Sequence, residues 1–198
     1  MPSYYERKNM NVKDAIEKRR AYRSLEPVGI TKELIYDLAK CAQITASCFN
    51  NQPWKYVFIH DKQKLREFYA VLTEQNQWVK RASLIVAVFS NQEDDCNVGE
   101  RHYYLFDTGM ATAFLILRAT ELGLVAHPIA GFKEGRAKEI LNIPKNMRLI
   151  TLVIIGKHSE GNNELMTDSQ KKIESVRPER KALTDFISID NFYKYYKQ

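Results

Sequence analysis

The chain has 198 residues, 44% of them hydrophobic, which is enough to build one sizeable core in a single domain spanning residues 1–198. No stretch approaches the roughly 18 consecutive apolar residues of a membrane-spanning helix. The first residues also lack the apolar segment of a secretory signal, so the sequence predicts a soluble cytoplasmic protein with no membrane partner. The net charge of +6 could attract nucleic acid, but the lysines are spread over the whole chain, as on an ordinary solvated surface.

The cysteines and histidines predict neither a disulfide framework nor a metal site. Cys41, Cys48 and Cys96 have no paired spacing, and their odd number argues against a set of disulfides. The four histidines are scattered, and none lies near a cysteine or a carboxylate at the spacing typical of metal ligands.

Two helices are predicted in the first 45 residues. Asn11 can cap a helix in which Val12, Ala15 and Ile16 recur at helical spacing. Thr31 can cap a second helix, whose apolar residues between 34 and 42 form one face. A polar loop without helical period is predicted from residue 45 to residue 53.

The middle of the chain alternates strands and helices. Residues 54–59 are rich in aromatic and β-branched side chains and predict a strand, after which Asp61 can cap a third helix. The unbroken apolar run of residues 84–89 predicts a buried strand. Residues 103–122 form the longest helical pattern and are apolar nearly all round, which predicts a helix buried on all sides, at the centre of the domain or in a dimer core.

The last third of the chain predicts a short extended segment at residues 125–129, a helix at 134–141 and a central strand at 148–155. A loop at 156–166 follows, and the tail from residue 186 is rich in aromatic side chains. Because helices and strands are interspersed without regular βαβ alternation, the pattern predicts an α+β layered domain. The glycine-rich fingerprints of dinucleotide-binding folds and P-loops do not occur.

Three segments carry candidate chemistry, and each also has a plainer interpretation. Residues 18–24 hold clustered arginines, which suit a phosphate but also suit the negative end of a helix dipole. Residues 46–54 offer hydroxyl and amide groups on a loop that leads into a strand, as an ordinary surface loop would. In residues 122–132, Pro128 fixes the backbone and Gly131 permits close approach of the main chain to a planar ligand, although both residues are common in turns.

Taken in this order, the segments resemble the nitroreductase family over about residues 11–187. The resemblance rests on an early arginine run, a Gln-Pro-Trp loop, an Asp-x-Gly-x-Ala helix, a Leu-Gly-Leu…Gly-Phe turn and a late basic motif. In this sequence these are Arg19-Arg20-Ala21-Tyr22-Arg23, Ala46-Ser47 through Asn50-Asn51-Gln52-Pro53-Trp54, Asp107-Thr108-Gly109-Met110-Ala111, Leu122-Gly123-Leu124 with Gly131-Phe132, and Arg180-Lys181-Ala182-Leu183.

The resemblance implies a three-layer α/β/α fold, with a mixed, mainly antiparallel sheet around a long buried central helix. It also implies an intertwined homodimer with non-covalent FMN at the subunit interface and NAD(P)H as co-substrate. The aromatic tail, about residues 186–198, is then expected to pack on the partner subunit.

The resemblance also implies roles for individual residues. Arg19 and Arg23 would hold the FMN phosphate and the polar edge of the ring, with Arg20 and Ala21 beside them, and Arg180 would close on the phosphate. Ser47 and Asn50 would contact the flavin from the other subunit, and Gln75 would approach its pyrimidine edge. One ring face would be lined by Pro128, Ile129, Ala130 and Gly131, with the catalytic contribution being the main-chain N–H of Gly131 near flavin N5.

This sequence departs from the family pattern at Ala21, Ala46 and Ala182, where the family usually has serine, proline and proline, and also at His127 and Ala130. These departures leave flavin binding as the expectation but make the substrate pocket hard to assign. Cys48 lies inside the flavin loop, where a packing role is favoured over a reactive thiol.

The expected activity is hydride transfer from NAD(P)H through flavin N5 to an electron-poor acceptor, such as a nitroaromatic or a quinone, by a ping-pong mechanism. An alternative on the same fold is a specialised flavin reaction, either reductive dehalogenation or flavin destruction. A lid inserted near residues 90–102 would favour this alternative. That stretch is short and acidic, so it leaves little room for such a lid. A non-catalytic flavin-binding or nucleic-acid-binding protein is the alternative from another class, but the sequence lacks a stripe of interleaved basic and aromatic residues.

Overall fold

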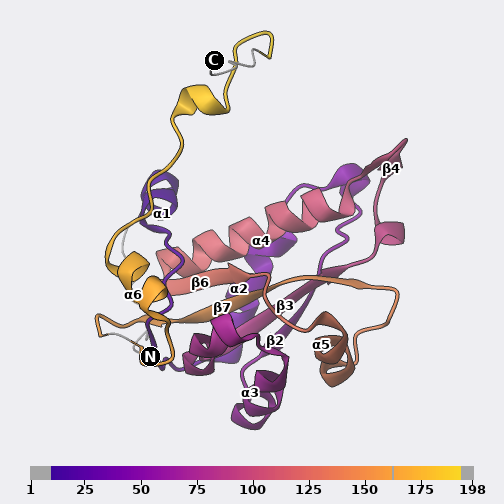
Figure 1. The fold of residues 1–198 in the computed structure, drawn as a ribbon. Helices are drawn as coiled ribbons and strands as arrows, with labels where there is room; N and C mark the ends of the chain where they lie inside the picture. The colour runs from indigo at the N-terminus through magenta and orange to yellow at the C-terminus, as the bar shows by residue number, and fades with distance from the viewer. Residues whose placement is uncertain (1–9, 162, 193–198) are drawn as a thin grey trace.

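A computed structural model describes residues 10–161 and 163–192 of the chain. Its centre is a five-stranded antiparallel sheet between two layers of helices (Figure 1). The strands of this sheet are β1 (Leu25–Glu26), β2 (Lys55–Ile59), β3 (Leu84–Ser90), β6 (Leu124–Ile129) and β7 (Arg148–His158). The expected three-layer α+β architecture is confirmed.

The long strand β7 organises the sheet. One edge of β7 pairs with β6, where Ala126 lies opposite Ile155. The other edge pairs with β3 and, beyond its end, with β1, and β2 then pairs with the outer edge of β3. All these pairs are antiparallel, so the parallel component expected of a mixed sheet does not occur among the described strands. The chain makes a crossover from β3 through α4 to β6, but β7 lies between these two strands, so they are not paired with each other.

The two faces of the sheet bury separate hydrophobic clusters. Along β3, Ile85 and Ala87 face one cluster, whereas Leu84 and Val86 face the other, as expected from the alternation of side chains along a strand. The first cluster is covered by α3 (Lys62–Phe68) and α5 (Glu134–Leu141), and the second by α2 (Lys32–Gln43) and α4 (Tyr104–Glu121). Since both faces are covered, β3 is apolar at nearly every position.

The helix starts follow from the caps that the sequence predicts. The side chain of Asn11 accepts a hydrogen bond from the N–H of Asp14 at the start of α1 (Val12–Lys18). Thr31 caps α2 and Asp61 caps α3 in the same way. Each bond satisfies one of the free amide groups at a helix N-terminus, which is why these boundaries can be read from the sequence.

Helix α4 is not buried on all sides within one chain, contrary to the expectation from its composition. Ala111, Leu115 and Ala119 are fully buried against the sheet, but Phe106 and Phe114 on other faces are 62% and 46% exposed. The helix therefore has one side in the domain core and another side uncovered. The other expectation, a helix in a dimer core, stays a prediction.

Several elements were not predicted. Helix α6 (Asp168–Ser175) begins with a capping box between Thr167 and Gln170, and a small hairpin pairs β4 (Asn97–Val98) with β5 (Arg101–His102). Strand β7 also continues three residues beyond the predicted end, to His158. The short 3-10 helices are η1 (Cys48–Asn50), η2 (Tyr69–Val71), η3 (Glu74–Arg81), η4 (Gln92–Asp94) and η5 (Leu183–Asp185).

The C-terminal segment leaves the body of the domain (Figure 1). Phe186, Ile189 and Phe192 are exposed, at 60%, 79% and 79%. The rest of the aromatic tail, residues 193–198, lies outside the described residues, so its expected packing on a partner stays a prediction. Among the described helices, none combines the length and apolarity needed to cross a membrane.

Candidate functional site

Arginines from both ends of the chain converge at the end of α1. Burial lowers the pKa of Arg19, and the positive charges of Arg180 and Arg177 lower it further. Arg19 and Arg23 also lie close enough to His127 to act on its charge. Within the described ranges, no carboxylate lies at ion-pair distance from the side chains of Arg19, Arg23 or Arg180. Cations held together without a counter-charge form a site for an anion with several oxygens, such as a phosphate.

Arg20 does not join this cluster. Its guanidinium donates to the carbonyl oxygens of Ile173 (3.0 Å) and Glu174 (2.8 Å) at the end of α6, and it also lies over the ring of Tyr22. These contacts anchor α6 to the chain after α1, so Arg20 is a scaffold residue in this structure. Ala21, between Arg20 and Tyr22, is partly buried and contributes only main chain.

Helix α6 holds the arginine segment in place. The carboxylate of Glu174 accepts hydrogen bonds from the N–H groups of Arg23 (2.9 Å) and Ser24 (2.7 Å). Arg177, just after the helix, donates to the carbonyl oxygen of Arg19 at 2.7 Å. The C-terminal segment thus clasps residues 19–24, which explains how Arg180 comes to lie near Arg19. No motif in the sequence indicated the roles of Glu174 and Arg177.

His127 lies in β6 beneath the arginines and is neutral at physiological pH. Burial lowers its pKa to about 4, and the charges of Arg23 and Arg19 act in the same direction. The ring packs against Trp78, with the ring centroids 4.8 Å apart, and Nδ1 lies 3.0 Å from the carbonyl oxygen of Tyr22. Since a carbonyl only accepts, Nδ1 carries the hydrogen and Nε2 is left as an acceptor.

The turn after β6 is held by side chains that the sequence analysis did not single out. Asn76 and Thr73 both donate to the carbonyl oxygen of Gly131, at 2.8 and 3.1 Å. A Cβ at Gly131 would meet Asn76 Nδ2 at 2.6 Å, so a side chain at this position would displace the Asn76 amide from its hydrogen bond to the turn. Pro128 and Ala130 are exposed, whereas the Ile129 side chain is buried in the core and leaves only its main chain for a ligand.

Gln75 is exposed, and its carbonyl oxygen accepts a hydrogen bond from the side chain of Gln170 in α6 (2.8 Å). The neighbouring Asn76 is the residue whose side chain reaches the Gly131 turn. A polar run at residues 73–77 was the available signal, but nothing in it distinguished Asn76 from Gln75.

The predicted loop at residues 45–53 has an unusual backbone. Phe49, Asn50 and Gln52 have positive φ angles of 46°, 58° and 50°, a conformation that is uncommon outside glycine. Ser47 stabilises the loop, because its hydroxyl accepts from the N–H of Gln52 at 2.9 Å. Asn50 and Phe49 are exposed, and Phe49 reaches 89%. The loop therefore presents side chains outward from its own domain.

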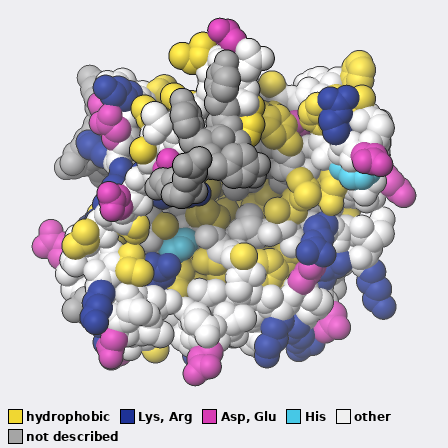
Figure 2. Space-filling model, turned by 45° about the horizontal axis from the view of Figure 1, so that its top comes forward, with side chains coloured by type: hydrophobic (Ala, Val, Ile, Leu, Met, Phe, Trp, Pro, Cys, Tyr) yellow, Lys and Arg dark blue, Asp and Glu magenta, His cyan; other side chains and the backbone are white. Residues whose placement is uncertain are grey.

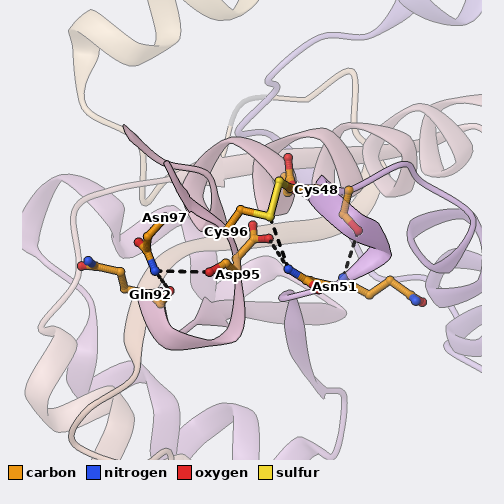
Figure 3. The surroundings of a disulfide bond; sticks show 9 residues. Cys48, Asn51, Gln92, Asp95, Cys96 and Asn97 are labelled. Atoms are coloured by element: carbon orange, nitrogen blue, oxygen red, sulfur yellow. Dashed lines mark hydrogen bonds between the residues drawn. A yellow bond between two sulfur atoms is a disulfide. The ribbon is translucent and has the colours of Figure 1, made fainter. Parts of the chain in front are cut away.

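Cys48 and Cys96 form a disulfide, and the expectation of no disulfide was wrong. The two residues are 48 positions apart, and only the fold brings the loop beside the segment before β4 (Figure 3). The third cysteine, Cys41, is free and is the reason for the odd count. Cys48 is thus a crosslinking residue in this structure, neither the packing residue nor the reactive thiol considered from the sequence.

Two buried carboxyl groups lie beside the disulfide. Asp107, in the first turn of α4, accepts a hydrogen bond from the N–H of Cys48 at 2.6 Å. Burial raises the pKa of Asp107, and the nearby carboxylate of Asp95 raises it as well. The Asp of the Asp-x-Gly-x-Ala motif therefore anchors the 45–53 loop to the start of α4.

The loop and the arginine cluster lie at opposite ends of α4. The loop is attached at Asp107, whereas α1, which leads into Arg19, packs with Phe114 and Arg118 around an apolar hollow of about 270 Å³. The eleven residue steps from Asp107 to Arg118 correspond to roughly 17 Å of helix. The structure thus brings Arg19, Arg23 and Arg180 together, but Ser47 and Asn50 of the same chain are far from them.

Hollows and apolar patches mark the surface on the α4 side. Figure 2 shows hydrophobic side chains gathered across a hollowed part of this face. The exposed apolar residues of α1, the end of α2 and α4 include Val12, Ile16, Ile44, Leu105, Phe106 and Phe114. A separate cavity of about 630 Å³ is lined in part by Lys18, Arg20, Lys157 and His158, and of the predicted cofactor residues it contains only Arg20.

The fold and the arginine cluster define an α+β protein whose clustered cations suit an anionic group. A family model described as the nitroreductase family matches residues 16–83 and 72–157, which together make up more than half of the chain. The chain belongs to the nitroreductase family.

Individual relatives agree with this assignment. A Bacillus subtilis protein provisionally named as an NAD(P)H nitroreductase is 25% identical, over 86% of this chain and 94% of its own length. An iodotyrosine deiodinase from Haliscomenobacter hydrossis is 26% identical, over 79% of this chain and 82% of its own length. A crystal structure described as an oxidoreductase containing FMN is 27% identical and superimposes with a TM-score of 0.80 over 98% of this chain and 99% of its own.

The disulfide predicts the thiol content of the protein. Without reductant, we expect one free thiol per chain in denaturant, from Cys41, and three after reduction, because Cys48 and Cys96 are paired. Titration with a chromogenic disulfide measures both numbers. The Cys41→Ser variant should show none before reduction, whereas three thiols in the unreduced native chain would contradict the pairing.

The burial of His127 predicts a pH dependence of stability. Its pKa of about 4 in the folded chain lies below the unfolded value of about 6.5. The contribution of neutral His127 to the free energy of unfolding is therefore fully present above pH 6.5. It is lost as the pH falls toward 4, and the loss is up to about 3 kcal/mol. Denaturant unfolding across this range should show a smaller fall for His127→Gln than for the native chain. The exposed His60→Gln variant is the control, and an unchanged fall in His127→Gln would refute the assignment.

Proposed function

We propose that the protein is an FMN-dependent oxidoreductase that works as a homodimer and passes electrons from NAD(P)H to a small electron-poor acceptor, such as a nitroaromatic or a quinone, in a ping-pong cycle. The observation that carries the proposal is the convergence of Arg19, Arg23 and Arg180 at the end of α1. Arg19 and Arg23 act there on the charge of His127, which lies in β6, the strand that leads into the Gly131 turn. Family membership supports flavin-dependent oxidoreduction, and the compared crystal structure is of an oxidoreductase containing FMN.

The residues present fit the phosphate of FMN. Arg19 carries a lowered pKa because it is partly buried beside Arg180 and Arg177, so the cluster is electrostatically unfavourable without an anion. A phosphate would remove this repulsion and accept hydrogen bonds from the guanidinium groups. We assign Arg19, Arg23 and Arg180 to this role and give Arg20 the task of holding α6.

The Gly131 turn fits the edge of the ring system. When bound, FMN would supply the redox chemistry, accepting a hydride from NAD(P)H and delivering it to the acceptor. The protein's part is to fix donors and to keep the ring in place. Asn76 and Thr73 hold the Gly131 carbonyl from the protein side and so fix the position of the turn. We assign the N–H of Gly131 to the position near flavin N5, with Pro128 and Ala130 beside the ring.

The dimer follows from the placement of the two half-sites. Ser47 and Asn50 lie at one end of α4 and the arginines at the other, so one chain cannot bring both to the same cofactor. A two-fold axis across the exposed face of α4 would set the loop of one chain beside the arginines of the other. It would also cover the apolar side chains on that face and offer a surface for the tail from Phe186 onward.

Reductive dehalogenation is the alternative that a specific observation favours, because one of the relatives is named iodotyrosine deiodinase. The segment at residues 90–102, where a lid was considered, contains η4 and the small β4–β5 hairpin. The disulfide ties this hairpin to the 45–53 loop. The hairpin is short and carries no helix of its own, which favours an open site over a lidded one.

An absorbance spectrum with an acceptor panel tests the proposal. Purified protein should show bands near about 370 and 450 nm, which bleach when NADH or NADPH is added without oxygen. Turnover of nitroaromatics and quinones but not of a halogenated tyrosine would support the reductase, and the reverse would favour dehalogenation. Protein that neither takes up FMN nor bleaches would refute flavin catalysis, and nucleic-acid binding would then be tested by a salt-dependent band shift.

The arginine cluster predicts how strongly FMN binding depends on single side chains. Arg19→Ala should weaken the Kd for FMN by about 10- to 100-fold, as measured by flavin fluorescence, because a charge-assisted hydrogen bond is removed. Arg20→Ala should have a smaller effect, since that side chain holds α6. Arg66→Ala, on the exposed side of α3, is the matched control. An equal loss of FMN affinity in all three variants would contradict the assignment of Arg19 to the FMN phosphate.

A further inference from the structure

The disulfide and Asp95 form a cluster of possible metal ligands. The sulfur atoms of Cys48 and Cys96 and a carboxylate oxygen of Asp95 all lie within 4.8 Å of one another. In Figure 3 the Asp95 carboxylate lies beside the sulfur pair, between the 45–53 loop and the segment before β4. The cluster lies at the Asp107 end of α4, away from the arginines assigned to FMN.

One atom of this cluster, Asp95 Oδ2, lacks a hydrogen-bond donor among the described residues. Asp95 is only 7% exposed, and its Oδ2 atom is buried without a hydrogen-bond partner in the part of the chain that the structure describes. Its other oxygen, Oδ1, accepts from the side chain of Asn51 at 3.3 Å. A buried carboxylate oxygen without a partner is costly. The neighbouring carboxyl of Asp107, whose pKa is raised by burial and by Asp95, can satisfy Asp95 when protonated, and a bound cation can satisfy it when Asp107 is ionised.

The geometry suits a tetrahedral ion once the disulfide is reduced. For Zn–S bonds of about 2.3 Å, two thiolates on one zinc ion lie about 3.8 Å apart. The sulfurs must therefore separate after reduction, whereas the Cα atoms, 6.0 Å apart, can keep their places while the side chains rotate. Two thiolates and one carboxylate favour Zn²⁺ over Mg²⁺ or Ca²⁺, which prefer all-oxygen sites.

We propose that the reduced chain binds one Zn²⁺ through Cys48 Sγ, Cys96 Sγ and Asp95 Oδ2, with water in the fourth position. A thiol reductant supplies two electrons and two protons, so that the S–S bond breaks, two thiols form and the reductant leaves as its own disulfide. Binding of Zn²⁺ then releases the two thiol protons, and three protein ligands hold the ion. The oxidised chain, with its sulfurs bonded to each other, does not bind the metal.

Neighbouring groups would fix these ligands. Asn51 holds Asp95 Oδ1 and also approaches Cys96 Sγ at 3.5 Å, so it orients two ligands at once. Asp107 accepts a hydrogen bond from the N–H of Cys48 and so fixes the backbone of that ligand. Outer contacts of this kind commonly raise metal affinity. The residues of the β4–β5 hairpin, which follow Cys96 directly, are mostly exposed, so solvent lies close to the cluster.

Equilibrium dialysis against Zn²⁺ tests the site on the full chain with its cofactor. The protein is reduced with a phosphine, freed of reductant without oxygen, dialysed, and analysed for zinc per chain. We expect one Zn²⁺ in the reduced chain and none above background in the oxidised chain. X-ray absorption at the zinc edge should show two sulfur neighbours at about 2.3 Å and lighter atoms near 2.0–2.2 Å.

Variants separate the proposed ligands from general thiol binding. Cys96→Ser should weaken binding at least about 100-fold and Asp95→Asn about 10-fold, while Cys41→Ser, which removes the cysteine outside the cluster, should bind as the native chain does. Flavin content is measured on the same samples and should be unchanged, so failure of the metal site is distinct from failure of flavin binding. The proposal is overturned if the reduced chain binds no more zinc than the oxidised chain, or if Asp95→Asn and Cys96→Ser bind as tightly as Cys41→Ser.

Discussion

The structure depends on strand β7, which is paired along both edges and covered on both faces. Its eleven residues receive β6 on one side and β3, then β1, on the other. Because β6 runs directly into the Gly131 turn and β1 follows the arginine segment, the register on β7 sets where these two parts lie relative to each other. Ile154 and Ile155 point into different hydrophobic clusters, so a slip of one residue would exchange the two cores.

Electrostatics adds a second constraint at the end of α1. Several arginines lie near the neutral His127. The carboxylates of the described residues do not neutralise the charges of these arginines. The Glu174 carboxylate accepts hydrogen bonds from main-chain N–H groups and not from a guanidinium group. The arrangement is unfavourable for an isolated chain and favourable for a chain with a bound phosphate, which is the pattern expected of a binding site rather than of a structural ion-pair network.

The length of α4 divides the functional residues into two groups. The disulfide loop is fixed at Asp107, and the arginine segment is attached near Arg118. The helix keeps these groups apart, so the proposed flavin site would draw one group from each of two copies of the chain. Phe106 and Phe114 are exposed on the same helix. An apolar helix side of this kind is stable only when something covers it, which agrees with the proposed pairing of two chains.

The sequence by itself determined the helix starts at Asn11, Thr31 and Asp61, the buried strands and the family, because caps, periodicity and motifs are local in the chain. Only the tertiary structure decided the contacts between distant residues. The Cys48–Cys96 bond, the clasp of Glu174 and Arg177 on residues 19–24, and the hold of Asn76 on Gly131 each join positions that are dozens of residues apart. No local pattern encodes such a pair, since its two members meet only after the sheet has set their positions. Burial on α4 was misjudged for the same reason, because composition does not say which side of a helix the chain itself will cover.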